Sequence, residues 1–331
     1  MPPTEVPPNL PPMKDLSVEN ITENVHLVNS QCPDPRTRYL FHRIVEHLHT
    51  FCRETQLSTE EWVAGMEFLV KIGQISDDVR KEMILLSDTL GVSSLVDSIN
   101  HPPMPGATEG TLIGPFHTHA EDMEHGAMIH SDPDATKLLV IGSAKDTDGN
   151  PLADVKIDVW EGDSKGFYDV QNPGSAPDGR GVLRSDKNGE FYFQAIVPVS
   201  YPIPQDGPVN QMLKMLNRHP NRPGHVHFLL DKDGYEILTT AIYPRGDPYE
   251  SSDPVFGVKE SLIVDLSTVD DEATANKYGV KVGTKLLQYN FVLLTDTQAR
   301  ELRRKNAIET FAKQGRKVVF HNDLPVPAVE T

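Results

Sequence analysis

Cysteine and long apolar runs are scarce in this 331-residue chain, and their scarcity excludes several classes of protein. With only Cys32 and Cys52, the chain has no framework of disulfides, and both thiols are expected to be reduced. No apolar run approaches the roughly 20 residues that a membrane-spanning helix requires. The proline-rich start also lacks the basic and apolar regions of a signal peptide. The sequence therefore predicts a cytoplasmic protein without membrane insertion.

Basic residues are few relative to acidic ones. The chain has 31 Lys and Arg against 48 Asp and Glu, which gives a formal net charge of −17. A surface of this sign repels the phosphates of nucleic acids and of anionic lipids. Nucleic acids and membrane surfaces are therefore not expected as partners.

The succession of sequence patterns predicts a mainly β protein with an all-α N-terminal part. Residues 1–16 are expected to form a mobile, proline-rich tail, and residues 17–100 a helical domain. Residues 101–136 are rich in Pro, Gly, His and acids and are expected to be a linker of loops that contributes to a functional site. Residues 137–331 are predicted to form a β-sandwich that ends in a helix and a tail.

Apolar residues at helical spacing define the expected helices, the first of which carries a stripe from Leu40 to Cys52. Ser58 and Glu61 form a capping-box pattern that opens a second helix. This second helix is expected to bury Trp62, Met66 and Leu69. Further helices are expected over residues 77–90, 93–99 and 298–313.

Short runs of β-branched and aromatic residues, separated by Asp-Gly and Asn-Gly turns, dominate the rest of the chain. Because no helices separate these runs, the pattern favours a sandwich over a parallel sheet. The expected strands cover residues 138–141, 155–160, 225–230, 237–243, 261–266 and 289–294.

Two histidines in one of these strands are the most informative feature of the sequence. Side chains alternate along a strand, so His225 and His227 share one face while Val226 points to the other. The pair can grip a metal ion, but it can also be a pair of hydrogen-bonded core histidines. Tyr168 and Tyr201 are packing residues when each is taken singly. A phenolate from either would make the site hard enough for ferric iron.

Other histidine clusters are weaker candidates for a metal site. His117 and His119 lie in a polar loop with Asp122 and His125 nearby. A separate run, His321-Asn322-Asp323, resembles half of a two-histidine, one-carboxylate iron site, but it lacks an evident third ligand.

Three segments together resemble the intradiol ring-cleaving dioxygenases, over about residues 16–294. The segments are Val159–Tyr168, Val197–Pro202 and Arg218–His227. Within that family the chain is most similar to hydroxyquinol 1,2-dioxygenases, through the runs Leu90–Asp97 and Ser252–Lys259. The run Thr111–Phe116 is typical of the family in general.

The resemblance implies a mononuclear Fe(III), one per subunit, held by Tyr168, Tyr201, His225 and His227. It also implies that Tyr201 is a switchable ligand and base. Arg222 would stabilise negative charge that develops on the substrate ring, although a plain salt bridge is the alternative role for this residue. The implied reaction is cleavage of hydroxyquinol (1,2,4-trihydroxybenzene) by O2 to 3-hydroxy-cis,cis-muconate or maleylacetate. The alternatives are a catechol 1,2-dioxygenase and, from a different class, a non-catalytic β-sandwich binding module.

The resemblance also implies a substrate pocket on the chain. Its expected residues are Ser94, Asp97, Ile113, Gly114, Phe116, Ile203, Pro204, Ala241 and Val255. We hypothesise that Asp97 accepts a hydrogen bond from the third hydroxyl of hydroxyquinol, and Phe116 has an alternative role in the core. Ala241 stands where catechol-cleaving relatives often carry glutamine, which loosens the assignment of the substrate.

The helical part has an implied role in assembly. In the family such helices build a homodimer interface whose apolar tunnel can hold a phospholipid. The stripe from Leu40 to Phe51 offers apolar surface for this role. An intramolecular core explains the same stripe equally well.

Overall fold

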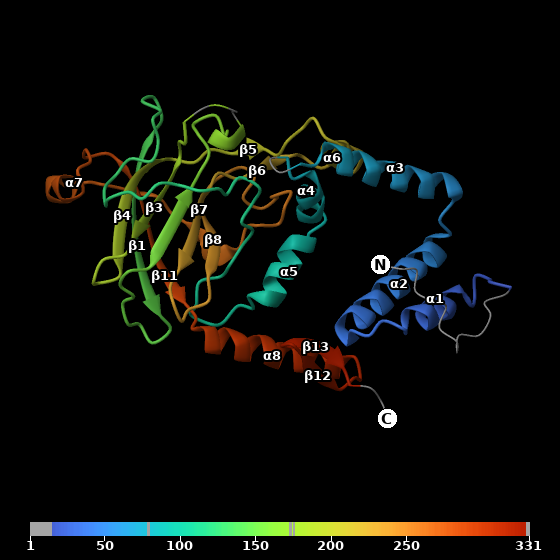
Figure 1. Ribbon diagram of the computed structural model, residues 1–331. Coiled ribbons are helices and arrows are strands. Elements are labelled where there is room, and N and C mark those ends of the chain that lie inside the picture. Colours follow the sequence, from blue (N-terminus) through green and yellow to red (C-terminus); the bar gives the residue numbers. More distant parts are fainter. Residues whose placement is uncertain (1–14, 78–79, 172–173, 175, 329–331) are drawn as a thin grey trace. The chain divides into compact units, whose positions relative to one another are not determined.

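The computed structural model describes residues 15–77, 80–171, 174 and 176–328 (Figure 1). Most of the expected mobile tail, residues 1–16, lies outside the described residues. The chain divides into two compact units, which we call the helical unit (residues 1–68 with 304–331) and the β-rich unit (residues 69–303). This division assigns the last helices of the expected 17–100 domain to the β-rich unit.

The eight helices of the described chain follow the order expected from the sequence, with three additions, over residues 21–29, 208–215 and 272–278. They are α1 (Ile21–Asn29), α2 (Pro35–Thr55), α3 (Thr59–Ile75), α4 (Glu82–Thr89), α5 (Val92–Asn100), α6 (Pro208–Met215), α7 (Glu272–Tyr278) and α8 (Asp296–Lys313). Two 3-10 turns are η1 (Asp169–Gln171) and η2 (Glu260–Leu262). The expected helix over residues 77–90 is shorter in the structure, since α4 begins only at Glu82. Within the described residues, no helix is long and apolar enough to cross a membrane.

The β-rich unit contains two main sheets. One has the strand order β10-β11-β1-β4 and the other β3-β2-β7-β8-β9. The strands are β1 (Lys137–Asp146), β2 (Lys156–Trp160), β3 (Arg180–Arg184), β4 (Glu190–Ile196), β7 (Val226–Asp231), β8 (Leu238–Pro244), β9 (Ile263–Val264), β10 (Ser267–Thr268) and β11 (Lys285–Leu293). A short pair, β5 (Tyr201–Pro202) and β6 (Asn221–Arg222), lies outside these sheets.

Most strand pairs are antiparallel, as the sandwich prediction requires, but β1 pairs with β11 and β8 pairs with β9 in parallel. The expected strand over residues 261–266 is only partly correct, because η2 and the two-residue β9 occupy most of it. The predicted fold class, a β-sandwich preceded by helices, is confirmed.

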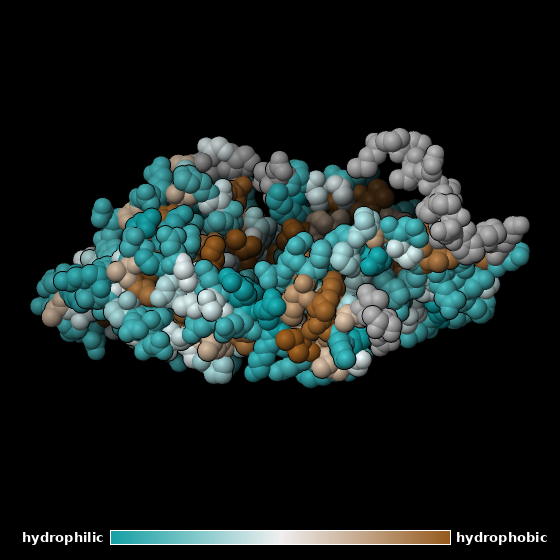
Figure 2. Space-filling view, turned by 60° about the horizontal axis from the view of Figure 1, so that its bottom comes forward, coloured by the Kyte–Doolittle hydropathy of each residue, from teal (hydrophilic) through white to brown (hydrophobic). Residues whose placement is uncertain are grey.

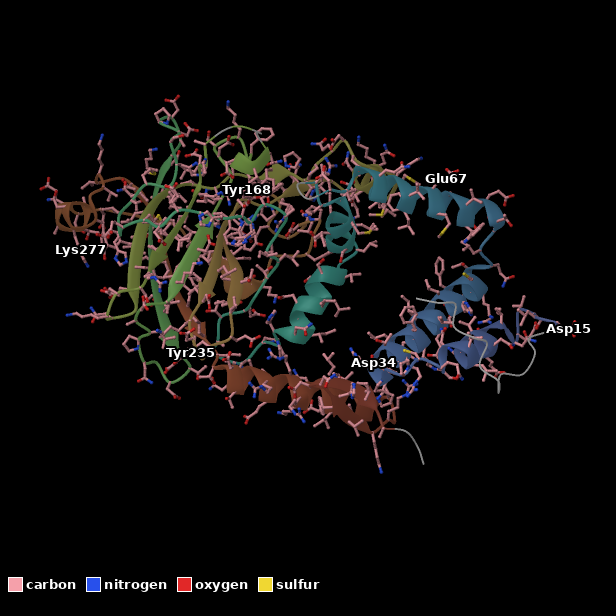
Figure 3. All side chains as sticks on the ribbon, in the orientation of Figure 1. Asp15, Asp34, Glu67, Tyr168, Tyr235 and Lys277 are labelled. Carbon is pink, nitrogen blue, oxygen red and sulfur yellow. The ribbon has the colours of Figure 1, made fainter. Side chains whose placement is uncertain are left out.

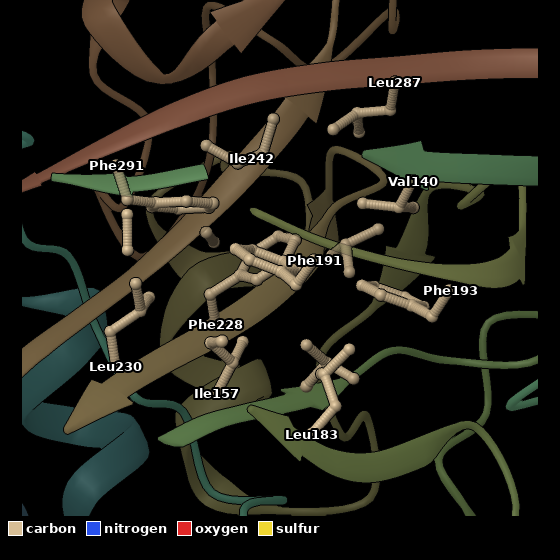
Figure 4. Packing of buried hydrophobic residues seen from close by; sticks show 14 of the residues in the cluster. Val140, Ile157, Leu183, Phe191, Phe193, Phe228, Leu230, Ile242, Leu287 and Phe291 are labelled. Carbon is tan, nitrogen blue, oxygen red and sulfur yellow. The ribbon is translucent and has the colours of Figure 1, made fainter. Parts of the chain in front are cut away.

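One continuous apolar core joins the inner faces of the two sheets (Figure 4). Val140, Phe191 and Phe291 come from one sheet, and Ile157 and Phe228 come from the other. All five side chains are buried, and the rings of Phe228 and Phe291 lie 4.9 Å apart across the core. Burial of this apolar surface is the main force that holds the sandwich together. The core thereby fixes β2, β7 and β8, which carry site residues on their other face.

The helical unit contains α1, α2 and a β-hairpin of β12 (Val318–His321) and β13 (Leu324–Pro327). The Asp34 side chain accepts a hydrogen bond from the Thr37 amide and caps α2, whose first residue is Pro35. The hairpin replaces the tail expected after α8. Its turn residues Asn322 and Asp323 both have positive φ.

The capping box at the start of α3 is confirmed. The Glu61 carboxylate accepts from the Ser58 amide, and the Ser58 hydroxyl accepts from the Glu61 amide. The expected burial of Trp62, Met66 and Leu69 is wrong, since these side chains are 53%, 44% and 43% exposed. The spacing of these three residues correctly predicts a helix, but Ile72 is the only residue of α3 that is buried.

Candidate functional site

The two histidines of the strand pattern lie side by side at the start of β7. Val226 points into the apolar core between the sheets, so His225 and His227 face the opposite side. Their Nε2 atoms are 2.9 Å apart, and both side chains are buried. The ring of Trp160, directly opposite His227 on β2, stacks on the His227 ring at 4.7 Å. This stack holds the orientation of His227.

Both tyrosines of the sequence prediction are buried beside these histidines. The Tyr168 and Tyr201 hydroxyl oxygens lie 3.4 Å apart. The Tyr201 ring is 5.7 Å from that of His225, and the Tyr168 ring is 6.4 Å from that of His227. Figure 3 shows Tyr168 among the side chains of the β-rich unit. The structure therefore brings all four expected donor residues together.

A glycine allows the two tyrosines to approach. Gly166 has a φ of +82°, and a Cβ at this position would lie 2.4 Å from the Cβ of Tyr201. Any side chain at residue 166 would be strained and would also push the loop before Tyr168 away from Tyr201. The short β5–β6 pair holds the other side, since Tyr201 pairs with Arg222 in this ladder.

Burial keeps both imidazoles neutral. It lowers the pKa of His225 to about 3, with the nearby Arg222 charge acting in the same direction. Burial and the neighbouring His225 likewise hold the pKa of His227 well below its usual value. The Nδ1–H of His225 donates to the Pro223 carbonyl oxygen at 2.8 Å, which leaves the lone pair on Nε2. A free nitrogen lone pair therefore points at the neighbouring ring.

The phenols are in a similarly dry environment. Burial, followed by the nearby Tyr201, raises the pKa of Tyr168 well above its usual value. A cation among the four side chains would reverse this preference, because it stabilises phenolate and takes up the imidazole lone pairs. Two hard phenolate oxygens and two imidazole nitrogens form a donor set that suits ferric iron. The residues present thus fit such a metal.

Arg222 joins this cluster from β6. Its Nη1 lies 3.3 Å from the Tyr201 oxygen and 3.4 Å from Nε2 of His225. Its Nε and Nη2 donate to the two carboxylate oxygens of Asp253, at 3.1 and 3.2 Å. Arg222 is therefore both a neighbour of the donor groups and one partner of a buried salt bridge, and its expected role toward the substrate stays a prediction.

Sequence reasoning missed two acids that hold the site together. Asp253 aligns the Arg222 guanidinium and accepts hydrogen bonds from the amides of Val255 and Gly257. Asp247 accepts from the Ser200 hydroxyl and from the Gly224 amide, both at 2.9 Å. The segment before Tyr201 is thereby tied to the segment before His225. Of these two acids, only Asp253 could have been suspected from the sequence, because it lies within the run Ser252–Lys259.

Several expected pocket residues adjoin the four donors. The Phe116 ring stacks on Tyr168 at 4.6 Å, and a Cβ at Gly114 would lie 3.7 Å from the His227 ring. Ala241 lies opposite His227 on β8. Val255 and Ile203 are buried. The Val255 amide donates to Asp253, the partner of Arg222, and Ile203 directly follows the β5 residues Tyr201 and Pro202. Ile113, by contrast, is 43% exposed.

The two expected pocket residues on α5 already have partners. The Ser94 hydroxyl donates to the Phe256 carbonyl oxygen at 3.1 Å. Asp97 lies 2.8 Å from Nδ1 of His101 and 3.9 Å from Nζ of Lys259. Phe256 precedes Gly257, whose amide binds the Asp253 carboxylate, so α5 packs against the loop that positions Arg222.

The other two histidine clusters suggested by the sequence do not bring three ligands within metal-binding distance of one another in the described part of the chain. His117 lies 3.0 Å from Asp158, and Nε2 of His125 lies 2.7 Å from the Arg184 carbonyl oxygen. In the helical unit, His321 lies 3.4 Å from Asp34, whereas Asp323 binds Arg304.

Comparisons with known proteins agree with this site. Residues 112–295 match a family model described as Dioxygenase, and residues 34–108 match one described as Catechol dioxygenase N terminus. The chain is 56% identical to the intradiol ring-cleavage dioxygenase hqdA of Aspergillus niger, over 97% of this chain and 98% of that protein. It is 44% identical to the hydroxyquinol 1,2-dioxygenase of a Rhizobium species, over 80% and 91% of the two chains.

A solved structure of a hydroxyquinol 1,2-dioxygenase has a similar fold. The hydroxyquinol 1,2-dioxygenase of Pseudomonas putida superposes with a TM-score of 0.79 at 40% identity, covering 84% of this chain and 99% of that one. The matched segments include Tyr168, Tyr201, His225, His227 and Arg222 within the Dioxygenase model. The chain therefore belongs to the family of intradiol ring-cleavage dioxygenases, oxidoreductases that use non-heme ferric iron.

Proposed function

We propose that Tyr168, Tyr201, His225 and His227 hold one Fe(III) per subunit and that the protein cleaves hydroxyquinol between adjacent hydroxyl groups. The observation that carries the proposal is the convergence of two buried phenols and two neutral imidazoles beside one buried guanidinium. When bound, Fe(III) supplies a Lewis-acidic, redox-active centre that binds a diol and prepares its ring for reaction with O2.

Tyr201 and Arg222 differ from the other site residues in what they can do. Of the two proposed tyrosine ligands, Tyr201 is the one that the guanidinium contacts, at 3.3 Å. If substrate binding released Tyr201 from the metal, its phenolate oxygen could accept a proton from a substrate hydroxyl. Arg222 then remains beside the ring, where its fixed positive charge stabilises the negative charge that develops there. The buried ion pair with Asp253 holds that charge in place.

Hydroxyquinol is the proposed substrate because both the Rhizobium relative and the Pseudomonas putida structure carry that name. We propose that Gly114, Phe116, Ala241 and Val255 contact the ring near the donors. Ile113, Ile203 and Pro204 complete the proposed apolar wall. Ser94 and Asp97 are proposed to face the third hydroxyl from α5. The product is then 3-hydroxy-cis,cis-muconate, or its tautomer maleylacetate.

Separate additions of hydroxyquinol and catechol to the aerobic protein test this proposal. We expect uptake of one O2 per hydroxyquinol, with the absorption spectrum of the hydroxymuconate product, and a smaller kcat/KM for catechol. Faster cleavage of catechol would overturn the substrate assignment and leave the reaction class intact. No uptake with either substrate in iron-loaded protein would contradict the proposed activity itself.

We also propose that α2 forms part of a homodimer interface. Leu40, Phe41, Ile44, Leu48 and Phe51 lie on α2 and are all about half exposed, which is unusual for so many large apolar side chains on one helix. Figure 2 shows apolar patches that interrupt an otherwise hydrophilic face. A second copy of the chain, with a phospholipid in the apolar space between the copies, would cover such a surface.

Sedimentation and lipid extraction test this assembly. A dimer at micromolar protein, converted to monomer by Phe41→Glu together with Leu48→Glu, is the expected result. Phospholipid should be recovered from the dimer by solvent extraction. A wild-type monomer would contradict the proposed interface, whereas a dimer without lipid would remove only the phospholipid.

A further inference from the structure

A second group of potential metal ligands lies in the helical unit. His26 is in the last turn of α1, while His42 and Glu46 are one turn apart on α2. One donor atom from each of the three side chains lies within 4.8 Å of the other two. Within the described chain, this is the one set of three histidine, cysteine or carboxylate ligands that is so close. None of these residues takes part in the proposed iron site.

His26 has an unusual environment for a histidine without a ligand. Both of its ring nitrogens are buried, and neither has a hydrogen-bond partner among the described residues. Its ring stacks on that of His42, with 3.7 Å between centroids and 26° between the planes. Buried polar atoms are nearly always paired, so two unpaired nitrogens on one ring call for a ligand, an ion or a water.

His42 and Glu46 supply the other two donor atoms of the group. Nε2 of His42 lies 3.4 Å from Oε1 of Glu46, at the (i, i+4) spacing that puts both on one helix face. Arg43 binds the second carboxylate oxygen of Glu46, Oε2. Oε1 is therefore the oxygen that faces the histidine pair.

The electrostatics favour a neutral imidazole at His26. Burial lowers the pKa of His26, and the neighbouring His42 acts in the same direction, against a weaker opposite effect of Glu46. A neutral ring has the lone pair that a metal needs. The groups that face this position are His42, Glu46 and His49, with Arg43 behind Glu46 and with Arg38 and Arg316 in the lining of the same cavity. Glu46 thus contributes the negative charge that a cation requires.

We propose that His26, His42 and Glu46 bind a divalent transition-metal ion, best matched by Zn²⁺, which ties α1 to α2. Two imidazole nitrogens and one carboxylate oxygen are an ordinary zinc donor set, and water completes the tetrahedron. A cavity of about 360 Å³, lined by both histidines, gives the ion and its water access. Tetrahedral bonds of the usual length place donors roughly 3.4 Å apart. Rotation of the two rings out of their stacked arrangement would bring the three atoms to that spacing.

Titration of Zn²⁺ into the iron-loaded protein tests the proposal directly. Because the iron donors are then already occupied, we expect one Zn²⁺ per chain by calorimetry or by competition with a chromogenic chelator. Zinc should also raise the thermal midpoint of the protein without changing its iron content or turnover. Unchanged iron content and turnover would separate this test from the test of the dioxygenase activity.

Variants identify the ligands. His26→Ala, His42→Gln and Glu46→Gln should each weaken zinc binding by at least about tenfold, since loss of a mere outer partner of a ligand already costs 10–100-fold. His42 is 42% exposed, so its replacement should fold even if the His26 variant does not. His119→Ala, which removes an exposed histidine of the β-rich unit, is the control and should bind zinc like the wild type. No zinc binding by the wild type, or binding that survives both His26→Ala and His42→Gln, would overturn the proposal.

Discussion

At the scale of single residues, the guanidinium of Arg222 depends on one carboxylate. Asp253 binds it through both oxygens and is itself fixed by two backbone amides. Despite its burial, Asp253 has a lowered pKa because Arg222 is close. The pair therefore stabilises the folded protein at pH values above the ordinary carboxyl pKa of about 4. That stability is lost as the pH falls through the lower pKa of the folded protein.

Removal of one charge of this pair should be costly. Asp253→Asn leaves the buried Arg222 charge without its partner, and we expect a loss of about 3 kcal/mol or more in the free energy of unfolding. Turnover should also fall because the guanidinium is no longer aligned. Urea denaturation and steady-state kinetics measure the two effects. Asp265→Asn, at an exposed acid beside Arg245, is the control and should change neither quantity. Wild-type stability in Asp253→Asn would contradict the structural role of this pair.

Asp97 tests the substrate assignment at the same scale. If its carboxylate binds the third hydroxyl of hydroxyquinol, Asp97→Ala should reduce kcat/KM for hydroxyquinol about tenfold more than for catechol. That factor corresponds to the roughly 1.5 kcal/mol of a hydrogen bond to a charged group. Side-by-side kinetics give the ratio. An unchanged ratio would show that Asp97 serves only its contacts with His101 and Lys259.

At the scale of elements, the site depends on a tie between two loops. Asp247 joins the segment of Ser200 and Tyr201 to that of Gly224 and His225. Neither segment belongs to the main sheets before β7 begins, so the apolar core alone does not fix their separation. A single acid thus positions two of the proposed iron ligands relative to each other.

Asp247→Ala should therefore reduce iron occupancy more than it reduces folding. We expect a lower iron content and weaker colour, with a far-UV circular dichroism spectrum like that of the wild type. Glu250→Ala, in the same turn but bound only to the Gly246 amide, is the matched control and should keep full iron. Full iron occupancy in Asp247→Ala would mean that the β5–β6 ladder is sufficient to hold Tyr201 in place.

The C-terminal end of α5 should make stability depend on pH. A hydrogen bond to Asp97 raises the pKa of His101 above its usual value, against a smaller effect of burial. The stabilisation is therefore complete below the unfolded pKa of about 6.5 and is lost as the pH rises through the higher folded value.

His101→Gln should flatten this part of the pH profile. His101 is 43% exposed, so the difference from the wild type should stay below about 1 kcal/mol. Urea midpoints measured from pH 5.5 upward to about pH 9 compare the two proteins, with His119→Gln as a control. Parallel profiles of wild type and His101→Gln would show that the Asp97 contact does not form in solution.

The elements that sequence patterns revealed are those with strong periodicity or strong caps. The Ser58 and Glu61 capping box marks α3, and alternation marks β7, because each depends on neighbours in sequence. α6 begins after a proline-rich stretch, and the strands of the Asn322-Asp323 hairpin are only four residues long with two prolines in the second, so local patterns gave too weak a signal for them. The exposed face of α3 could not be foreseen either, since helical spacing does not say what covers a face.

At the scale of the whole molecule, the site is assembled from segments that are distant in sequence. Tyr168, Tyr201 and His225 could be proposed from motifs, because a family resemblance carries them together. Asp247 and Trp160 could not, because their roles arise only when loops and strands meet in the fold. The β-rich unit supplies all four proposed ligands, so we expect this unit alone to determine the iron chemistry.

The assignment of Tyr168 and Tyr201 as iron ligands is best tested by visible spectroscopy. The spectrum of the iron-loaded protein is compared with that of Tyr168→Phe at equal iron content. Phenolate bound to Fe(III) gives a charge-transfer band, so the wild type should be red. Tyr168→Phe should lose a large part of that band, and addition of hydroxyquinol without O2 should shift the remainder as Tyr201 is displaced. A colourless wild type with one iron per chain, or an unchanged band in Tyr168→Phe, would contradict the assignment of the tyrosines as ligands.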